Sequence, residues 1–316
     1  MILKQIPEDF IVIEIPNDFS GEGPYQIYEL TKVNYNTEDA VEAVVKALGI
    51  KRKQVSYAGN KDRNAITKQF ISLKKVSKEK VESINLKDIQ LVFKGYSNKP
   101  VYLGDLKGNK FEITIRGLKE KINIEKNVKI PNFYDTQRFS EYNHIIGKAL
   151  IKRDFEKATS YIIKSSTKYG KVMRTHLDNN PNDYVNALKK IPTRVLQIYL
   201  YSYQSFLWNK LANKNLGEEN NFLPIPGFGT ETKDYKDIFK EEEINERDFI
   251  LREFPEISME GSQRKLYSEV NDLRISDYEK DDLNPGYKLK ISFSLGKGSY
   301  ATMVVKHLLK NGSSGI

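Results

Sequence analysis

Cysteine is absent from this chain of 316 residues, and histidine is nearly so, with only His144, His176 and His307. Without cysteine the chain can form no disulfide framework, zinc ribbon, iron–sulfur cluster or thiol nucleophile. The three histidines lie far apart and show no HExxH spacing, which argues against a metal site built from histidine. Zinc deaminases are excluded as well, because they bind their metal through histidine and cysteine.

Long apolar runs are also missing. No stretch approaches the roughly 18 residues of a membrane span, and the acidic Glu8 and Asp9 come too early for a secretory signal. We therefore expect a soluble, cytoplasmic protein. The chain is 39% hydrophobic and 29% charged, which is typical of a globular protein. Its length corresponds to two domains of roughly 150 residues each.

Positive charge is concentrated in one segment. The chain carries 51 Lys and Arg against 42 Asp and Glu, and residues 46–80 alone hold 11 basic and 2 acidic side chains. Residues 231–260 show the opposite bias, with 5 basic and 11 acidic side chains. A local basic excess is the footprint of a partner with a phosphate backbone, and a solvated lysine-rich face is an equally good interpretation.

Hydrophobic periodicity predicts strands at both ends of the chain and helices between them. We expect strands at 9–15, 55–57, 67–73, 110–116 and 287–295, and helices at 37–48, 141–166, 193–214 and 300–310. Asn36 and Thr37 are interpreted only as the N-terminal cap of the first helix, and Gly49 as its end. This order indicates an α+β domain interrupted by a helical insertion, with a loose tail at 312–316.

The residues best suited to covalent chemistry lie in the glycine-containing segment 57–69. Asp62 stands there between Lys61 and Arg63, and neighbouring cations keep a carboxyl group ionised. An ionised carboxylate on a loop is a reasonable nucleophile at a sugar carbon. An aspartate that merely completes a turn is the alternative, which these residues alone favour. The chain has no dinucleotide fingerprint, P-loop or serine-triad spacing.

The stretch Gly59–Gln69 resembles the GxKDxxAxTxQ signature of the TruD family of pseudouridine synthases. Further segments resemble the family in the same order along the chain: Glu8–Glu14, Asn36–Thr37, Leu103–Phe111, Pro131–Phe139, Tyr203–Asn209, Leu223–Gly229 and Gly296–Thr302.

The resemblance implies an isomerase without a cofactor that converts uridine to pseudouridine in tRNA, with uridine 13 as the target. Asp62 falls on the family's catalytic aspartate and Lys61 on its lysine partner. Asn132 and Tyr134 fall on residues of the target pocket, where the aromatic ring stacks on a flipped-out uracil. Gln137 and Arg138, in turn, are expected to contact RNA or brace the pocket, with capping of the following helix as the alternative.

The chain departs from the family pattern at four positions. Tyr134 stands where phenylalanine is common, which keeps a stacking ring and adds a hydroxyl that needs a partner. Asp135 and Ser140 replace glycines, so the loop geometry is expected to differ. Tyr102 stands where a basic residue is common, which removes one expected phosphate contact.

Together these observations predict a pseudouridine synthase domain with a mixed or antiparallel sheet, formed by residues 1–154 and 262–316, and a mostly helical insertion at 155–261. A basic cleft for folded tRNA is expected to include Lys51–Lys53, Lys61, Arg63, Lys68, Lys74 and Lys75. We expect a monomer that needs no metal, cofactor or membrane. Whether Asp62 adds to C1′ or promotes loss of the C2′ proton stays open. A tRNA-binding or tRNA-folding module without catalysis is the alternative function.

Overall fold

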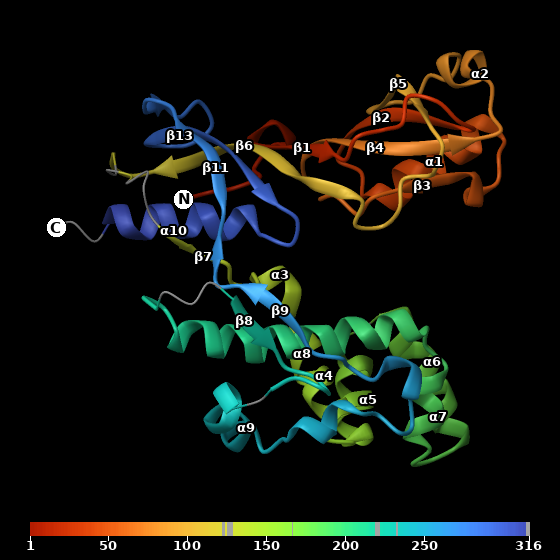
Figure 1. The fold of residues 1–316 in the computed structure, drawn as a ribbon, viewed down its shortest axis with the longest axis vertical. Coiled ribbons are helices and arrows are strands. Elements are labelled where there is room, and N and C mark those ends of the chain that lie inside the picture. Colours follow the sequence, from red (N-terminus) through yellow and green to blue (C-terminus); the bar gives the residue numbers. More distant parts are fainter. Residues whose placement is uncertain (122–123, 125–128, 166, 219–221, 232, 314–316) are drawn as a thin grey trace. The chain divides into compact units, whose positions relative to one another are not determined.

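The computed structural model describes residues 1–121, 124, 129–165, 167–218, 222–231 and 233–313. The chain divides into two compact units (Figure 1). Unit 1 comprises Met1–Val128, Glu269–Ala301 and Val305–Ile316, and unit 2 comprises Lys129–Ser268 and Thr302–Val304. Within the described part of the chain, no helix is long and apolar enough to cross a membrane.

Unit 1 is built on a mixed sheet with the strand order β11-β13-β6-β1-β4-β2-β5, in which β3 also pairs with β4 and β12 with β13. β1 and β4 run parallel, and their neighbours in the sheet pair antiparallel. The strands are β1 (Phe10–Pro16), β2 (Tyr25–Val33), β3 (Val55–Tyr57), β4 (Ile66–Lys74), β5 (Ile89–Ser97), β6 (Leu106–Leu118), β11 (Val270–Ile275), β12 (Glu279–Lys280) and β13 (Tyr287–Gly296).

The first α-helix of unit 1 begins and ends where the sequence supplies caps. In α1 (Thr37–Leu48) the side chain of Asn36 accepts the N–H of Asp39 at 2.8 Å. The helix ends at Gly49, whose φ of 59° lies in the left-handed region that glycine tolerates best. The remaining helical segments are η1 (Pro7–Asp9), η2 (Arg52–Gln54), α2 (Lys78–Glu82) and most of α10 (Ala301–Ser313), of which Thr302–Val304 are assigned to unit 2.

Unit 2 is mostly helical and has a core of its own. Its elements are β7 (Ile130–Pro131), α3 (Thr136–Phe139), α4 (Asn143–Ile151), α5 (Phe155–Lys164), α6 (Lys168–Asn179), α7 (Tyr184–Lys189), α8 (Thr193–Lys214), β8 (Phe222–Ile225), η3 (Lys233–Tyr235), α9 (Lys236–Glu242), η4 (Glu246–Phe249), η5 (Pro255–Ile257), β9 (Ser262–Lys265) and β10 (Tyr267–Ser268).

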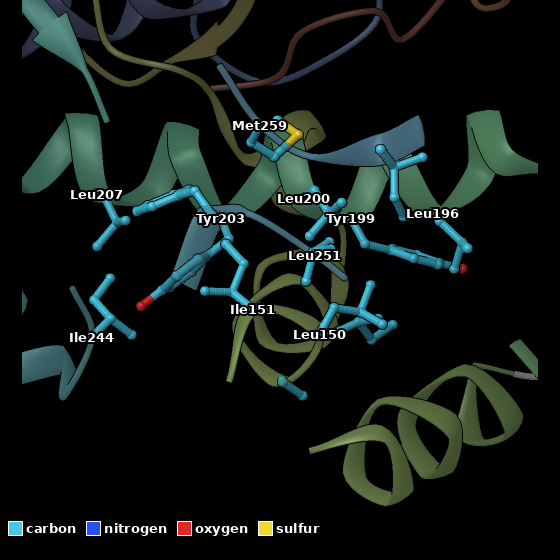
Figure 2. Close-up of a cluster of buried hydrophobic side chains, with 14 of the residues drawn as sticks. Leu150, Ile151, Leu196, Tyr199, Leu200, Tyr203, Leu207, Ile244, Leu251 and Met259 are labelled. Atoms are coloured by element: carbon cyan, nitrogen blue, oxygen red, sulfur yellow. The ribbon is translucent and has the colours of Figure 1, made fainter. Parts of the chain in front are cut away.

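The long helix α8 organises this core (Figure 2). Leu196, Leu200 and Tyr203 lie on one face of α8. They are buried in the same cluster as Leu150 of α4 and apolar side chains that come after α8 in the sequence. Each fully buried side chain of this size contributes about 1.5–3 kcal/mol relative to an exposed one. α4 approaches α8 closely at Gly147, because a Cβ atom there would lie 2.2 Å from the carbonyl oxygen of Tyr199.

The mixed sheet and the helical second unit confirm the predicted α+β fold class, and most of the predicted elements are present. The amphipathic segments predicted between residues 141 and 166 form two helices, α4 and α5, because the chain turns at Arg153 with a φ of 59° and Asp154 then caps α5. The strands β2, β5 and β11 were not predicted from the sequence.

The chain's C-terminal helix, α10, continues to Ser313, three residues beyond its predicted end. The rest of the expected tail, 314–316, lies outside the described residues. The boundaries predicted for the helical insertion, 155 and 261, fall inside unit 2 and stay a prediction.

Candidate active site

Asp62 lies in the loop between β3 and β4 of unit 1, and its side chain is 37% exposed. The Nζ atom of Lys4 lies 2.6 Å from Asp62 Oδ2, and this lysine side chain is 17% exposed. The same ammonium makes a cation–π contact with Phe10, at 4.1 Å from the ring centre. One carboxylate oxygen of Asp62 therefore has a fixed cationic partner, while part of the side chain stays open to a ligand.

The backbone of this loop is held by Lys32 of β2, a side chain with no exposed surface. Its ammonium donates to the carbonyl oxygen of Asp62 at 2.8 Å and to that of Tyr35 at 2.5 Å. Burial lowers the pKa of Lys32 to about 8, although the nearby charge of Asp62 acts in the opposite direction. Burying an ammonium against two carbonyl groups is costly, so its presence indicates that the position of Asp62 is closely specified.

The ammonium of Lys61 pairs with Glu14 of β1, at 2.6 Å, and the two side chains are 7% and 0% exposed. Glu14 also accepts the backbone N–H of Phe70 at 3.1 Å. The sequence led us to expect Lys61 as the cation beside the carboxylate of Asp62. In the structure Lys4 takes that position, and Lys61 neutralises a buried glutamate.

A buried hydrogen-bond chain fixes the start of the loop. The hydroxyl of Thr37 donates to Gln69 Oε1 at 2.8 Å and accepts the backbone N–H of Lys61 at 2.8 Å. The side-chain amide of Gln69 in turn donates to the carbonyl oxygen of Gly59 at 3.1 Å. Asn36 is the helix cap that the sequence predicted, whereas Thr37 also joins α1 to the Asp62 loop, a role that the sequence analysis did not assign.

Arg63 and Lys68, both predicted to bind substrate, occupy different settings. Arg63 is exposed in the loop next to Asp62. Lys68 is half-buried on β4, and successive strand residues point to opposite faces of a sheet. The side chain of Lys68 therefore lies on the face opposite to that of Thr67 and Gln69, away from the chain of bonds that holds the loop.

The other basic residues expected to line a cleft are mostly exposed in unit 1. Lys51, Lys53 and Lys75 are exposed, and Lys74 is half-buried with its ammonium 4.7 Å from the centre of the Tyr25 ring. The guanidinium of Arg52 is bound to Glu38 at 2.8 and 2.9 Å, so its charge is already paired.

In unit 2, Asn132 follows β7 and is 7% exposed. Its side-chain oxygen accepts from Arg264 at 2.9 Å and from Ser268 at 3.1 Å, and its amide donates to the carbonyl oxygen of Lys265 at 3.1 Å. Arg264 also donates to the backbone carbonyl of Asn132 at 2.8 Å. These bonds hold Asn132 in one orientation against β9 and β10.

Tyr134 lies next to the same arginine. The guanidinium of Arg264 is 4.0 Å from the centre of the Tyr134 ring and 5.1 Å from that of Trp208. The backbone N–H and carbonyl of Tyr134 both bond to the side chain of Asn209, at 2.9 Å each. The ring is thus held through the backbone contacts with Asn209 and through its cation–π contact with Arg264.

The short helix α3 carries the remaining predicted residues. Its N-cap is Asp135, whose side chain accepts the N–H of Thr136 at 2.7 Å, and the N-cap of the helix that follows, α4, is Tyr142, so neither Gln137 nor Arg138 is an N-cap. Arg138 donates to Ser205 Oγ at 3.0 Å, and its guanidinium lies 5.6 Å from the Tyr134 ring. This contact fits the role of bracing the pocket, whereas the side chain of Gln137 is exposed.

Ser140, the second residue that replaces a family glycine, ends α3 with a φ of 44°. The backbone there therefore keeps a left-handed conformation that glycine adopts more readily.

The predicted residues belong to two sets. Lys61, Asp62, Arg63 and Lys68 lie in unit 1, and Asn132, Tyr134, Gln137 and Arg138 lie in unit 2. Four charged side chains that contact them were assigned no role from the sequence: Lys4, Glu14, Lys32 and Arg264. Glu14 lies in a segment that matched the family pattern, which was the one available signal.

Comparison with known proteins decides the family. The family model described as tRNA pseudouridine synthase D (TruD) matches residues 1–171, 161–227 and 221–308. The chain belongs to the TruD family. This is a family of isomerases, so the enzyme class expected from the sequence is confirmed.

Relatives match the chain over nearly its whole length. A Methanosarcina acetivorans protein named "Probable tRNA pseudouridine synthase D" is 30% identical over 98% of this chain and 92% of its own. A Methanocaldococcus jannaschii protein named "Probable tRNA pseudouridine synthase D 2" is 32% identical over 97% and 91%. The crystal structure of a Methanosarcina mazei protein named "Putative tRNA pseudouridine synthase D (TruD)" has a TM-score of 0.76 at 28% identity, covering 98% of this chain and 93% of that one.

Proposed function

We propose that the chain isomerises uridine to pseudouridine in tRNA, at uridine 13, with Asp62 as the nucleophile. Family membership and the names of the relatives support the reaction and the substrate class. The observation that supports Asp62 is its double fixation: Lys4 contacts its carboxylate and Lys32 its backbone carbonyl. A partly exposed carboxylate held in this way is prepared for reaction without having to reorganise.

The reaction requires one carboxylate and a uracil ring that can turn within the site. The N1–C1′ bond of uridine breaks, the uracil turns, a bond forms between C5 and C1′, and the proton on C5 is replaced by one on N1. Two routes begin from ionised Asp62: addition to C1′, or removal of the C2′ proton to give a glycal. Deuterium at C2′ separates them, because only the second route breaks that C–H bond and gives a primary isotope effect.

The residues of unit 2 support recognition of the flipped uracil. Tyr134 offers a ring for stacking, and Arg264 fixes that ring and orients Asn132. Arg63 and the exposed lysines of segment 46–80 supply contacts to phosphates. The proposed reaction needs no cofactor. We infer that a single copy of the chain carries it out, in the cytoplasm.

The deciding experiment compares wild type with Asp62→Asn on an unmodified tRNA transcript. We expect wild type to form pseudouridine at one mapped position. The variant should bind tRNA with an unchanged Kd and form product at least about 10³-fold more slowly. Asp18→Asn is a matched control, since among the residues that the structure describes this exposed carboxylate pairs with Lys107 alone, at the surface of unit 1. If wild type binds tRNA and makes no pseudouridine, the alternative of a non-catalytic tRNA-binding module replaces this proposal.

A further inference from the structure

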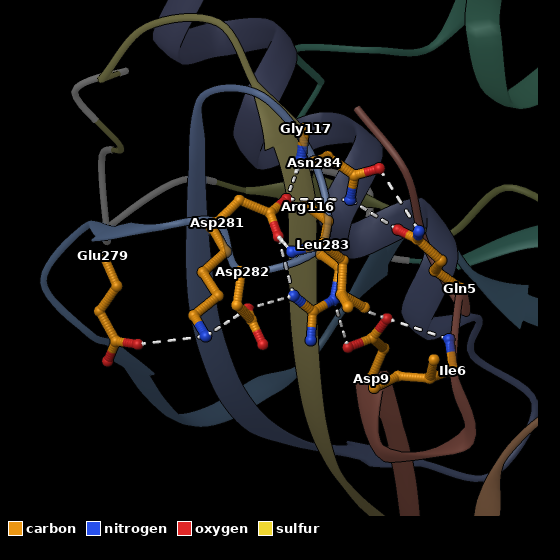
Figure 3. Close-up of polar contacts among 11 residues, drawn as sticks. Gln5, Ile6, Asp9, Arg116, Gly117, Glu279, Asp281, Asp282, Leu283 and Asn284 are labelled. Atoms are coloured by element: carbon orange, nitrogen blue, oxygen red, sulfur yellow. Dashed lines mark hydrogen bonds and ion pairs between the residues drawn. The ribbon is translucent and has the colours of Figure 1, made fainter.

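A second cluster of charged residues lies in unit 1, apart from the site described above, and is buried except for Asp282, whose side chain is 58% exposed (Figure 3). Arg116 of β6 is 5% exposed and contacts three carboxylates. Its Nε atom donates to Asp9 at 2.8 Å, and its Nη1 atom donates to Asp281 at 2.9 Å and to Asp282 at 2.7 Å. We call these four residues the Arg116 hub.

The Arg116 hub fixes the N-terminal segment on both sides of Lys4. Before Lys4 in the sequence, the backbone N–H of Ile2 donates to the carbonyl oxygen of Arg116 at 2.8 Å. The N–H of Arg116 in turn donates to the carbonyl oxygen of Ile2 at 3.0 Å. After Lys4 in the sequence, the hub carboxylate of Asp9 accepts the backbone N–H of Ile6 at 3.2 Å (Figure 3).

The C-terminal part of unit 1 adds a further tie. The hub carboxylate of Asp281 accepts the N–H of Gly117 at 2.8 Å and the side-chain amide of Asn284 at 3.1 Å. Asn284 also donates to Gln5, the residue directly after Lys4, at 2.7 Å (Figure 3). Segments from both ends of the chain therefore meet at Arg116 and hold residues 2–9 in place.

Between these ties, Lys4 has a conformation that the local sequence does not favour. Its φ is 57°, in the left-handed region that residues with a Cβ rarely adopt, so the surrounding contacts must impose it. From this backbone its ammonium reaches Asp62 at 2.6 Å. The hub does not touch the Lys4 side chain in these contacts, and it determines where that side chain starts.

We propose that the Arg116 hub is a positioning device for the reaction: it sets the Lys4 ammonium against Asp62 by fixing the N-terminal backbone. The inference rests on the proposed role of Asp62. Stability alone is a weak reason for such a cluster, because buried ion pairs can often be replaced by apolar side chains without loss. The planar, forked guanidinium instead fixes the positions of the segments that it joins, since it binds several carboxylates in a geometry that lysine cannot reproduce.

The test is a double-mutant cycle between the hub and Lys4. Asp9→Asn keeps the size of the side chain and weakens its attraction for Arg116, and Lys4→Met removes the cation at Asp62. We expect Asp9→Asn to lower kcat on unmodified tRNA about 10-fold, with the Kd for tRNA changed less than twofold. In the Lys4→Met background, the same change should lower kcat by less than twofold, because the group that the hub positions is gone. Arg116→Lys should behave like Asp9→Asn.

A purely structural role gives a different pattern. If the two kcat effects multiply in the double variant, or if Asp9→Asn lowers only the melting temperature while kcat per folded enzyme is unchanged, the proposal is wrong. Glu112→Gln is the control, because it removes a carboxylate of β6 that pairs with Lys110 at the surface, and it should leave kcat within twofold. Should Arg116→Lys fail to fold, the isosteric Asp9→Asn still decides. Absence of product with wild type is the separate result that overturns the proposed function.

Discussion

The two units hold their candidate residues by different kinds of contact. In unit 1 the neutral bonds of Thr37 and Gln69 at the start of the Asp62 loop are joined by full charges: Lys4 at the carboxylate, Lys32 at the backbone, and the buried pair of Lys61 with Glu14. In unit 2 the contacts that hold Asn132 and Tyr134 come from amides, carbonyls and one stacked guanidinium. Ionic fixation suits a group that reacts, whereas neutral contacts and stacking suit a surface that receives an uncharged base.

The largest effect is expected from breaking the buried pair of unit 1. Lys61→Met leaves Glu14 charged and without its cation in a site with no solvent access. Such a loss costs about 3–5 kcal/mol, which urea denaturation measures. Adding Glu14→Gln should restore part of the stability, because no uncompensated charge remains. Equal loss in the single and double variants would show that Lys61 does not act through Glu14.

The next largest effect is expected in the pH dependence of the free energy of unfolding, where the buried Lys32 of unit 1 contributes. The pKa of Lys32 is about 8 in the folded protein and about 10.4 when exposed, so between these values the unfolded chain binds more protons. Stability therefore rises with pH across this window, by at most about 3 kcal/mol for a shift of this size. Comparing the stability of wild type with that of Lys32→Met from pH 7 to 10.5 isolates this contribution, since the variant lacks the rise. The same pH dependence in both proteins would contradict the assignment.

The predictable part of the fold follows from periodicity and caps. Asn36 and Gly49 mark α1, and the apolar stripe of Leu196, Leu200 and Tyr203 marks α8, because these signals are local. β2 was not predicted because it carries Lys32, and a lysine usually indicates a surface position. In the structure Lys32 is fully buried, because tertiary contacts supply acceptors for its ammonium.

The site was predictable only where its residues are neighbours in sequence. Asp62 and its flanking cations share one loop, and the pocket residues share one segment. Lys4 meets Asp62 across 58 positions and Arg264 meets Asn132 across 132, so no local spacing relates them. The sequence therefore pointed to Asp62 as the candidate nucleophile and to the adjacent Lys61 as its cation, whereas the fold brings the distant Lys4 to its carboxylate.

A smaller effect is expected where unit 2 depends on stacking. Arg264→Lys keeps the charge and loses the flat group that lies on Tyr134 and the paired bonds to Asn132. We expect kcat/KM on tRNA to fall about tenfold, equivalent to about 1.4 kcal/mol, with a small change in melting temperature. Arg247→Lys, an exposed change in the same unit, should leave kcat/KM unaltered. An unaffected Arg264→Lys enzyme would mean that charge alone, and not stacking, matters at this position.

The smallest effect concerns salt, and it contrasts the basic segment 46–80 with the acidic segment 231–260. Each phosphate contact contributes about 0.7–0.9 to the slope of log K for tRNA binding against log salt. Arg63→Gln should therefore reduce that slope by roughly one, because Arg63 is exposed beside Asp62. Lys233→Gln removes another exposed cation, one that already pairs with Glu231, and it should leave the slope unchanged. If wild-type affinity barely responds to salt, then the charge of segment 46–80 serves solvation and not the RNA backbone, and recognition would have to come from the stacking contacts of unit 2.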